Sequence, residues 1–388
     1  MSGLTGRQRL RRWLLRAAAR LPLPPTHRPA APPARVLAIR PDDLGDVVLA
    51  TPALARLRAG LPAARLTVAA GPWAVEALRH GPPHDALLTL PFPGTSRVAR
   101  ASLLAPYALL LRQARRLRAG RYDAALILRP DHWWGALLAW AAGIPRRLGY
   151  AVPEVAPFCT ETLPPPAGLH AAAQSLALVD LLLGRAGPMT PAAAPLVFRV
   201  TGDERARAGE LLAGLPPGGP LVAIHPGAGS PIKQWPGERW AAVAATLRAE
   251  RAARLVLTGG PGEAALTGPI AATLPPDGVL DLAGRTDLGT LAAVFARCDL
   301  VLGVDSGALH VATAVAPRTL RLYGPSDQVT YGPWGDPARH RLLRAGLRCP
   351  LCHQLDRTAV CPPDCMGAIA AAPVAAAALD LLAVPVSV

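Results

Sequence analysis

Short apolar runs alternate with helical segments along this chain of 388 residues, and the alternation occurs in two series. The first series of runs lies at residues 35–40, 65–70, 86–90 and 124–129. The second series lies at residues 221–225, 254–258, 278–282, 299–304 and 319–323. Buried strands that alternate with helices are typical of a parallel sheet with helices on both faces. The sequence therefore predicts an α/β chain with two doubly wound, Rossmann-like domains, and a ligand cleft at the carboxyl ends of their strands.

The region between the two series contains many prolines and one helical segment, at 171–183, but no further strong strand. A chain of this length also exceeds what one ordinary hydrophobic core supports. We therefore predict a Rossmann-like domain over residues 34–190 and a second one over residues 191–388, preceded by an extension over residues 1–33.

The extension begins with a stretch, residues 4–21, whose pattern is that of a basic amphipathic helix. One face carries Arg9, Arg12, Arg16 and Arg20, and the other carries Leu10, Trp13, Leu14, Ala17 and Leu21. Such a helix is expected to dock on an anionic membrane surface. A helix that packs on its own domain and a disordered basic tail are the alternatives. The proline-rich residues 21–33 that follow are predicted to be a linker.

No apolar run reaches the roughly 20 residues needed to cross a bilayer, and the arginines of the extension argue against a secretory signal peptide. We therefore expect a cytoplasmic protein, peripheral on the inner face of the cell membrane. The formal net charge of +15 favours an anionic partner. Aromatic residues make up only 4% of the chain and do not alternate with basic ones, which disfavours nucleic acid as that partner.

Three carboxylates, Asp42, Asp43 and Asp46, lie in the turn that follows the first predicted strand. Because apolar residues flank this turn, at least one carboxylate is expected to point into the ligand cleft. A carboxylate there suits a general base that takes a proton from an attacking hydroxyl. The alternative is that these residues only cap the helix that follows.

The first strand of the second series runs into a loop of small residues that contains Gly227, Gly229 and Lys233. Such a loop lets the backbone approach a phosphate closely. Lys233 is the one lysine among 41 basic residues. Its retention indicates a site that needs a compact ammonium rather than a planar guanidinium, unless it remained by chance.

Two further strand ends in the second half carry polar residues. Residues 299–304 are followed by Asp305, Ser306 and Gly307, and the amides at the start of the next helix can receive a diphosphate. His310 lies one helical turn later, where a ligand role and a structural role are both open. A glycine-rich turn after 254–258 ends at Glu263, an acid suited to ribose hydroxyls.

The motifs RPDDLGDVVLATPAL, HPGAGSPIKQWP, LTGGPGE, VLGVDSGALHVATA and LYGPSD occur in this order. Together they resemble glycosyltransferase family 9, the ADP-heptose lipopolysaccharide heptosyltransferases, over about residues 35–382. The resemblance implies a GT-B fold, an ADP-heptose donor bound by the C-terminal domain, an acceptor bound by the N-terminal domain, and a final helix, 367–382, that returns to the first domain. It also implies transfer without a metal ion.

By position, the resemblance implies that Asp46 is the catalytic base and that Glu263 contacts the ribose. It assigns the donor phosphates to Lys233, Asp305, Ser306, Gly307 and His310. Candidates on the acceptor side are Arg40, Asp43, Arg129, His132 and Arg146, which match no pattern of the family. A phosphorylated lipid A-type core sugar is the family's usual acceptor, but another glycolipid, a glycan or a protein side chain would need the same donor site.

Four cysteines are spaced compactly near the C-terminus: Cys349, Cys352, Cys361 and Cys365. This spacing would suit structural zinc or an iron–sulfur cluster. Reduced thiols and a local disulfide are the alternatives, and no cofactor is expected to be required for catalysis.

The resulting hypothesis is an inverting glycosyltransferase. Asp46 deprotonates the acceptor hydroxyl, while Lys233, His310 and the amides of Ser306 and Gly307 stabilise the departing diphosphate. A nucleotide-sugar epimerase of GT-B type and a non-catalytic nucleotide-sugar-binding protein are the alternatives. The epimerase would consume the donor in the absence of an acceptor. The binding protein would bind ADP but would release no ADP from the donor.

Overall fold

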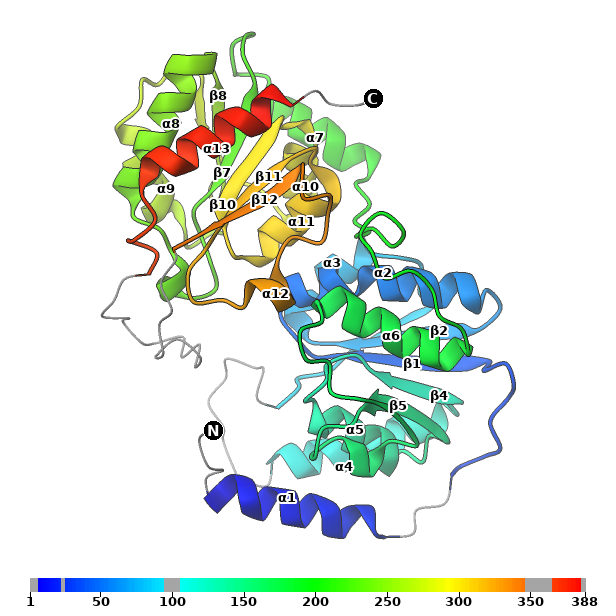
Figure 1. Ribbon diagram of the computed structural model, residues 1–388. Helices are drawn as coiled ribbons and strands as arrows, with labels where there is room; N and C mark the ends of the chain where they lie inside the picture. The colour runs from blue at the N-terminus through cyan, green and yellow to red at the C-terminus, as the bar shows by residue number, and fades with distance from the viewer. Residues whose placement is uncertain (1–5, 22–24, 94–104, 346–364, 385–388) are drawn as a thin grey trace. The chain divides into compact units, whose positions relative to one another are not determined.

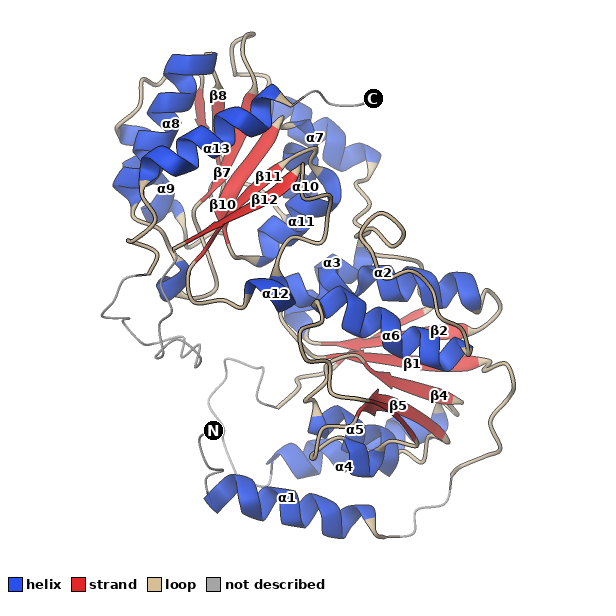
Figure 2. Ribbon diagram, viewed as in Figure 1, coloured by secondary structure: helices blue, strands red, loops and turns tan. Residues whose placement is uncertain are grey.

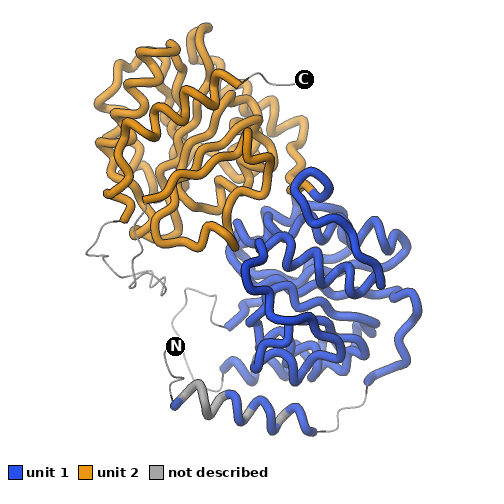
Figure 3. The backbone as a smooth tube through the Cα atoms, in the orientation of Figure 1, with its two compact units in different colours: residues 1–194 blue, residues 195–388 orange. Residues whose placement is uncertain are grey.

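The computed structural model describes residues 6–21, 25–93, 105–345 and 365–384. The chain divides into two compact units, Met1–Ala194 and Pro195–Val388 (Figure 3). Each unit contains one six-stranded sheet in which every paired strand is parallel to its neighbour. Helices lie on the faces of both sheets (Figure 2). The prediction of two doubly wound α/β sheets is therefore confirmed.

The sheet of unit 1 has the strand order β3-β2-β1-β4-β5-β6. Its strands are β1 (Arg35–Arg40), β2 (Arg65–Ala70), β3 (Ala86–Thr89), β4 (Ala124–Ile127), β5 (Arg146–Tyr150) and β6 (Glu161–Leu163). Five of the six residues of β1 are buried, as expected for a central strand covered on both faces. The order reverses beside β1, so the end of this strand is the switch point at which α/β sheets bind ligands.

Helices cover unit 1 in two layers (Figure 1). α2 (Leu44–Gly60) and α6 (Ala171–Leu183) pack against each other on one face of the sheet, where α3 (Val75–Arg79) also lies. α4 (Ala105–Ala119) and α5 (Trp133–Ala141) pack together on the other face.

The sheet of unit 2 has the corresponding order β12-β11-β10-β7-β8-β9. Its strands are β7 (Leu221–His225), β8 (Arg254–Leu257), β9 (Val279–Asp281), β10 (Leu300–Val304), β11 (Thr319–Tyr323) and β12 (His340–Arg344). Its helices are α7 (Gly202–Leu212), α8 (Gly237–Arg251), α9 (Ala264–Ala272), α10 (Leu288–Arg297), α11 (Gly307–Val315), α12 (Gln328–Tyr331) and α13 (Ala371–Ala383). The central strands β7 and β10 are buried along their whole length.

Three strands were missing from the sequence prediction: β5, β6 and β12. The short strand β6 lies in the region 151–195, where no strong strand was expected, and it pairs with β5. β6 and β12 are edge strands, and β5 begins with two arginines, so none of the three forms the continuous apolar run by which buried strands are recognised.

The last helix was expected to return to the first domain; in the structure it belongs to unit 2. α13 packs on α8 and β10 of unit 2. Val374, Ala378 and Leu381 are fully buried in the core cluster that also holds Trp240 of α8. Small apolar side chains on this face of α13 let it lie close to the sheet of its own unit.

The N-terminal extension forms helix α1 (Gly6–Ala19), as predicted. Leu15, which the sequence pattern placed on neither face, is 4% exposed and belongs to the core cluster of unit 1, and Arg12 Nε lies 2.5 Å from Glu154 Oε1. Trp13 and Leu21 are 65% and 61% exposed. One side of α1 therefore packs on its own unit while large apolar side chains remain outside.

The linker after α1 is attached to unit 1 through Asp123. Its carboxylate lies 3.0 Å from His27 Nε2 and accepts hydrogen bonds from the backbone N–H groups of Ala30, Ala34 and Arg35 at 2.9–3.1 Å. Burial would raise the pKa of Asp123, but these bonds outweigh it and lower the pKa. Within the described residues, no helix is both long and apolar enough to cross a membrane.

Candidate functional site

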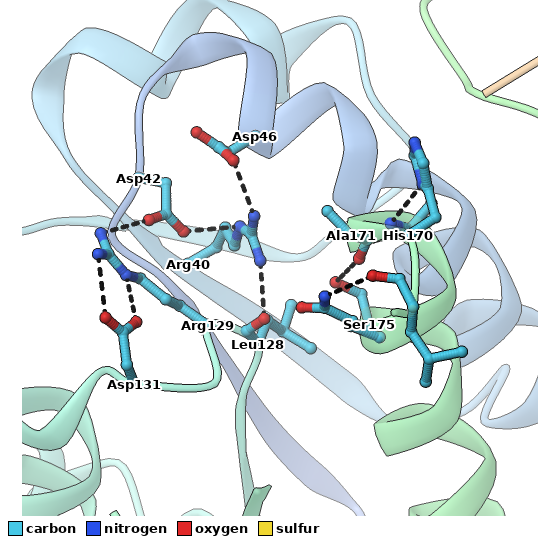
Figure 4. Close-up of polar contacts among 12 residues, drawn as sticks. Arg40, Asp42, Asp46, Leu128, Arg129, Asp131, His170, Ala171 and Ser175 are labelled. Atoms are coloured by element: carbon cyan, nitrogen blue, oxygen red, sulfur yellow. Dashed lines mark hydrogen bonds and ion pairs between the residues drawn. The ribbon is translucent and has the colours of Figure 1, made fainter. Parts of the chain in front are cut away.

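The acidic turn of unit 1 joins β1 to α2, and Asp43 occupies the N-cap position of α2 without a capping hydrogen bond from its side chain. Asp46 lies in the first turn of the helix. Its carboxylate approaches Arg40, with Arg40 Nη2 at 3.3 Å from Asp46 Oδ1 (Figure 4). The structure thus directs Asp46 toward an arginine at the end of β1.

Arg40 is held on three sides. Its Nε lies 2.8 Å from Asp42 Oδ2, and its Nη1 donates a 2.7 Å hydrogen bond to the carbonyl of Leu128, just beyond β4. The third contact is the one to Asp46. Because β1 and β4 are paired neighbours, their carboxyl ends bring Arg40 and the turn after β4 together.

Arg129 extends this network. Its Nη1 lies 2.7 Å from Asp42 Oδ1, and its Nε and Nη2 lie 2.7 and 3.3 Å from the two carboxylate oxygens of Asp131 (Figure 4). Three carboxylates, Asp42, Asp46 and Asp131, thus surround two guanidinium groups, Arg40 and Arg129. Of the candidates on the acceptor side, Arg40 and Arg129 join Asp46 in one network.

The electrostatics of this network single out Asp46. The pKa of Asp46 is raised to about 7, chiefly by burial and next by the negative charge of Asp42, while Arg40 and Arg129 oppose the rise. For Asp131, burial would raise the pKa, but the hydrogen bonds and charge of Arg129 lower it. The Asp46 side chain is still 25% exposed. A carboxylate with a pKa near neutrality that remains accessible is suited to general-base chemistry.

His132 lies in the turn between β4 and α5, which also contains Arg129 and Asp131, and it is the N-cap residue of α5. It is 6% exposed, neither ring nitrogen has a hydrogen-bond partner within the described part of the chain, and Phe92 packs edge-on at 5.2 Å between ring centroids. Burial lowers the pKa of His132 to about 4, so the ring is neutral at physiological pH. Arg146, in contrast, pairs with Glu161 across β5 and β6, away from the network.

In unit 2, Lys233 and Asp305 come together although 72 residues separate them. Lys233 ends the short helix η3 (Pro231–Lys233) after β7, and Asp305 directly follows β10. Lys233 Nζ donates to Asp305 Oδ2 at 2.7 Å. The side chain of Asp305 is 8% exposed and that of Lys233 is 22% exposed, so the ammonium group is oriented by a buried carboxylate.

Buried hydroxyls lie at the same edge of this sheet. The hydroxyl oxygens of Ser230, Ser306 and Ser326 have no hydrogen-bond partner among the residues that the structure describes. They follow β7, β10 and β11, which are neighbours in the sheet, and Ser306 is the N-cap of α11, whose first residue is Gly307. Buried polar groups are normally hydrogen-bonded, so this edge is suited to a polar ligand.

Glu263 is placed at the end of β8 by the backbone N–H of Gly260, which donates to Glu263 Oε2 at 2.7 Å. Its carboxylate lies over Gly227, where a Cβ atom would stand 2.1 Å from Glu263 Oε1. Any side chain at position 227 would therefore displace Glu263. Gly229, in the same loop, is exposed.

His310 is bound to an arginine that the sequence analysis did not identify. Arg321, in β11, is fully buried, and its Nη1 lies 3.1 Å from His310 Nδ1. Its Nη2 donates to the carbonyl of Leu309 and the hydroxyl of Thr313. Because a guanidinium group can only donate, His310 Nδ1 accepts, and the proton of the neutral ring is on Nε2. The sequence carried one signal of this buried arginine, because it interrupts the otherwise largely apolar run TLRLY.

Three of the four clustered cysteines, Cys349, Cys352 and Cys361, lie outside the described residues, whereas Cys365 is described and is 5% exposed. Within the described ranges, no group of histidine, cysteine and acidic side chains has an arrangement that could hold a metal ion. Arg321 is a polar residue near the unit 2 site that the sequence did not single out, whereas Ser230 and Ser326 lie in the motifs HPGAGSPIKQWP and LYGPSD without an assigned role. A buried hydroxyl has no signature in a sequence, because serine is common in exposed loops.

Comparison with known proteins identifies the family. Residues 110–354, more than half of the chain, match glycosyltransferase family 9 (heptosyltransferase). Over 321 residues the chain is 26% identical to lipopolysaccharide heptosyltransferase 3 of Escherichia coli K12, a match that covers 81% of this chain and 89% of that protein. Lipopolysaccharide heptosyltransferase 2 of the same strain is 27% identical over 323 residues, covering 79% of this chain and 87% of that protein.

Solved structures give the same result. The glycosyl transferase family 9 structure from Veillonella parvula aligns with a TM-score of 0.71 and 25% identity, covering 90% of this chain and 97% of that one. The E. coli ADP-heptose lps heptosyltransferase II aligns with a TM-score of 0.68 and 22% identity, covering 90% and 98%, and shares the fold. The GT-B fold implied by the sequence is thus confirmed, and the chain belongs to glycosyltransferase family 9, the heptosyltransferases.

Proposed function

We propose that this glycosyltransferase transfers heptose from ADP-heptose to a phosphorylated sugar of a lipopolysaccharide core or a related glycolipid. Two relatives that match most of the chain are lipopolysaccharide heptosyltransferases. The observation that carries the proposal is Asp46, an accessible carboxylate whose pKa is raised to about 7 at the switch point of the unit 1 sheet. Such a group can accept a proton from a hydroxyl at neutral pH.

The proposed reaction is one displacement with inversion at the anomeric carbon. The acceptor oxygen forms the new bond to that carbon as its proton passes to the Asp46 carboxylate. The bond from the anomeric carbon to the β-phosphate oxygen breaks, and ADP leaves with the electron pair. No bond to an enzyme atom forms, so configuration inverts.

The residues of unit 2 hold the donor in this proposal. Lys233, oriented by Asp305, neutralises the charge that develops on the diphosphate, and the amides of Ser306 and Gly307 at the start of α11 donate to it. Glu263 binds the ribose hydroxyls. His310, with its proton on Nε2, donates to the same phosphates, and Arg321 acts as the positioning residue that fixes this tautomer.

The division of labour between domains follows from these roles. Residues 34–190 bind the acceptor and residues 191–388 bind the donor. Arg40 and Arg129 are the acceptor-side residues that touch the Asp46 network, and they suit a phosphorylated acceptor because a guanidinium fork matches phosphate geometry. The neutral His132 and the N-cap residue Asp43 lie beside them and are proposed to contact the acceptor's hydroxyls.

Location and metal content complete the proposal. The enzyme works in the cytoplasm, held through residues 4–21 on the anionic inner face of the membrane, where a lipid-linked acceptor is available. Transfer requires no metal ion. Cys349, Cys352, Cys361 and Cys365 are proposed to hold structural zinc or an iron–sulfur cluster, and metal analysis of protein purified without chelator tests this, since a substoichiometric metal content would contradict it.

One assay tests the function. The protein is incubated with labelled ADP-heptose, with and without glycolipid from a strain whose lipopolysaccharide lacks heptose, and both ADP release and labelled lipid are followed. We expect ADP and labelled lipid in equal amounts and only when acceptor is present. Inverted configuration at the new linkage, read by NMR of the product, supports single displacement, whereas retained configuration contradicts it.

The same assay distinguishes the alternatives. Conversion of ADP-heptose without acceptor would identify an epimerase. Binding of ADP-heptose with no release of ADP under any condition would identify a non-catalytic binding protein.

A further inference from the structure

α4 presents an unusual outer face. Its inner residues, Leu110, Ala114 and Leu117, are buried in the core cluster of unit 1. Its outer residues include two large apolar side chains, Tyr107 at 43% and Leu111 at 57% exposure. Four exposed arginines accompany them, namely Arg112, Arg115, Arg116 and Arg118. The helix contains no acidic residue, so its outer face is both strongly basic and partly apolar.

α1 repeats this combination. Trp13 in the middle of the helix and Leu21 just beyond it are 65% and 61% exposed, and Arg16 and Arg20 are also exposed. α1 also contains no acidic residue. Four of the eight large hydrophobic side chains that are exposed in the described part of the chain therefore belong to these two segments.

The two helices belong to the same side of unit 1. Leu15 of α1 lies in the core cluster that also contains Leu110, Ala114 and Leu117 of α4. Both helices lie on the face of the sheet opposite α2 and α6 (Figure 1). We use the name basic face for the exposed residues Trp13, Arg16, Arg20, Leu21, Tyr107, Leu111, Arg112, Arg115, Arg116 and Arg118.

We propose that α4 shares membrane docking with α1, so that the basic face as a whole binds the surface of an anionic lipid bilayer. This inference deepens the proposed function, because it adds a second helix to the surface on which a lipid-linked acceptor would be met. Arginines are attracted to anionic headgroups, while tryptophan, tyrosine and leucine enter the boundary between headgroups and acyl chains.

The chemistry of the face favours a bilayer over a nucleic acid. Single-stranded nucleic acids are bound by basic grooves whose aromatic side chains stack on bases, whereas the face also exposes Leu21 and Leu111, aliphatic groups that gain nothing from phosphate or base contacts. Each arginine near an anionic membrane strengthens binding by about fivefold, equivalent to about 1 kcal/mol. Arg16 and Arg20 are the exposed described arginines of the α1 segment, and the four exposed arginines of α4 add to them.

The test removes three charges from α4. In the first variant, Arg112→Gln, Arg115→Gln and Arg116→Gln are combined, and Arg118 is kept because it donates to the carbonyl of Ala141. The matched control combines Arg205→Gln, Arg207→Gln and Arg251→Gln, three exposed arginines in helices α7 and α8 of unit 2. Both variants lose the same net charge.

Binding is measured by sedimentation with vesicles of phosphatidylcholine and with vesicles of phosphatidylcholine mixed with phosphatidylglycerol. We expect the α4 variant to lose on the order of 10²-fold in partitioning to the anionic vesicles, from three arginines at about fivefold each. The control should change little, because its three arginines do not belong to the basic face. Deleting residues 1–21, which contain six arginines, should also weaken binding.

A second variant, Leu111→Ser with Tyr107→Ser, removes apolar groups that are exposed and so leaves the core intact. It should abolish the part of vesicle binding that survives high salt. Unchanged binding of the arginine variant, or equal losses in that variant and its control, would overturn the proposal. Loss of affinity for a short RNA duplex, with vesicle binding intact, would also overturn it and assign the face to nucleic acid.

Transfer to a detergent-dispersed acceptor is measured in parallel. The α4 variant should keep this activity, because none of its residues belongs to the Asp46 or Lys233 sites. A wild-type protein that binds anionic vesicles through α4 but transfers no heptose would refute the proposed function and leave the docking surface standing.

Discussion

The turn after β1 in unit 1 and the edge formed by β7, β10 and β11 in unit 2 occupy equivalent places in their sheets but have different electrostatics. In unit 1, three carboxylates share two arginines, and one of them, Asp46, has a pKa raised to about 7. In unit 2, Lys233 meets one buried carboxylate, Asp305. The arrangement in unit 1 raises the pKa of a carboxylate, and the arrangement in unit 2 orients an ammonium group that can bind an anion.

The difference follows from which groups lack partners. In unit 1 the guanidinium groups of Arg40 and Arg129 form ion pairs with the surrounding carboxylates, and Asp46 is the carboxylate of this network whose pKa is raised. In unit 2 the hydroxyls of Ser230, Ser306 and Ser326 have no partner within the described residues. The same strand-end geometry can therefore carry either function, depending on whether the turn residues pair among themselves.

The largest effect should come from removing the excess carboxylate. Asp46→Asn is expected to lower transfer by about 10²–10⁴-fold, the range for a positioned general base, while ADP binding and the melting temperature stay unchanged. Initial rates measure transfer, ADP titration measures ADP binding, and thermal unfolding measures the melting temperature. Asp43→Asn, at the neighbouring N-cap carboxylate that is proposed only to contact the acceptor, should cost less than Asp46→Asn. Near-normal activity of Asp46→Asn would contradict a catalytic role for the unit 1 turn. The carboxylates of this turn would then serve only to begin α2.

Lys233→Arg should reduce kcat/KM by about 5- to 150-fold, equivalent to about 1–3 kcal/mol for a hydrogen bond to a charged group. A planar guanidinium cannot replace the ammonium that sits 2.7 Å from Asp305 without moving that carboxylate. The measurement is transfer kinetics with ADP-heptose. Wild-type rates in this variant would mean that unit 2 needs only a positive charge at this position.

Arg321→Met should lower kcat by about tenfold, at the low end for a hydrogen bond with a charged donor. The substitution keeps the length of the side chain and removes a buried charge that no described carboxylate pairs within ion-pair distance, so the melting temperature should not fall. Nitrogen NMR of His310 supplies a readout that a packing role would not change. We expect protonation at Nε2 in the wild type and mixed tautomers in the variant.

The smallest effect at neutral pH should come from Asp42→Asn. Burial is the main cause of the raised pKa of Asp46, and the charge of Asp42 is the next. Removing that charge lowers the pKa of Asp46, so the acid limb of the pH–rate profile should move to lower pH while the rate at its plateau changes only a few-fold. An acid limb that stays in place would show that Asp42 does not influence the titrating group.

Much of the fold could be predicted from the sequence because buried parallel strands are continuous apolar runs. β1, β7 and β10 are such runs, and the residues after them form the two sites. β6 and β12 could not be predicted in this way, since edge strands carry polar residues that need no core.

The site could be predicted only as far as strand ends determine it. Asp46, Lys233 and Asp305 follow from their place after a strand. Asp46 contacts Arg40 and does not cap the helix. This choice depends on the orientation of the side chain, which the periodicity of the sequence does not encode. Arg321 is a case of the same kind, because its partner His310 comes from a neighbouring helix and not from its own strand.

The carboxylate of Asp123 makes the N-terminal extension sensitive to its length. Four groups from residues 27–35 converge on its two oxygens, so an insertion or deletion between His27 and Arg35 would pull the chain off this anchor. A shortened protein that starts at residue 34 keeps β1 but leaves Asp123 Oδ1 without its contacts to His27 and Ala30. Because the folded pKa of Asp123 is lowered, its contribution to stability is present above its unfolded pKa and disappears as the pH falls through the folded value. Shortening to residue 34 would therefore cost stability at neutral pH, whereas removal of residues 1–21 leaves the anchor whole.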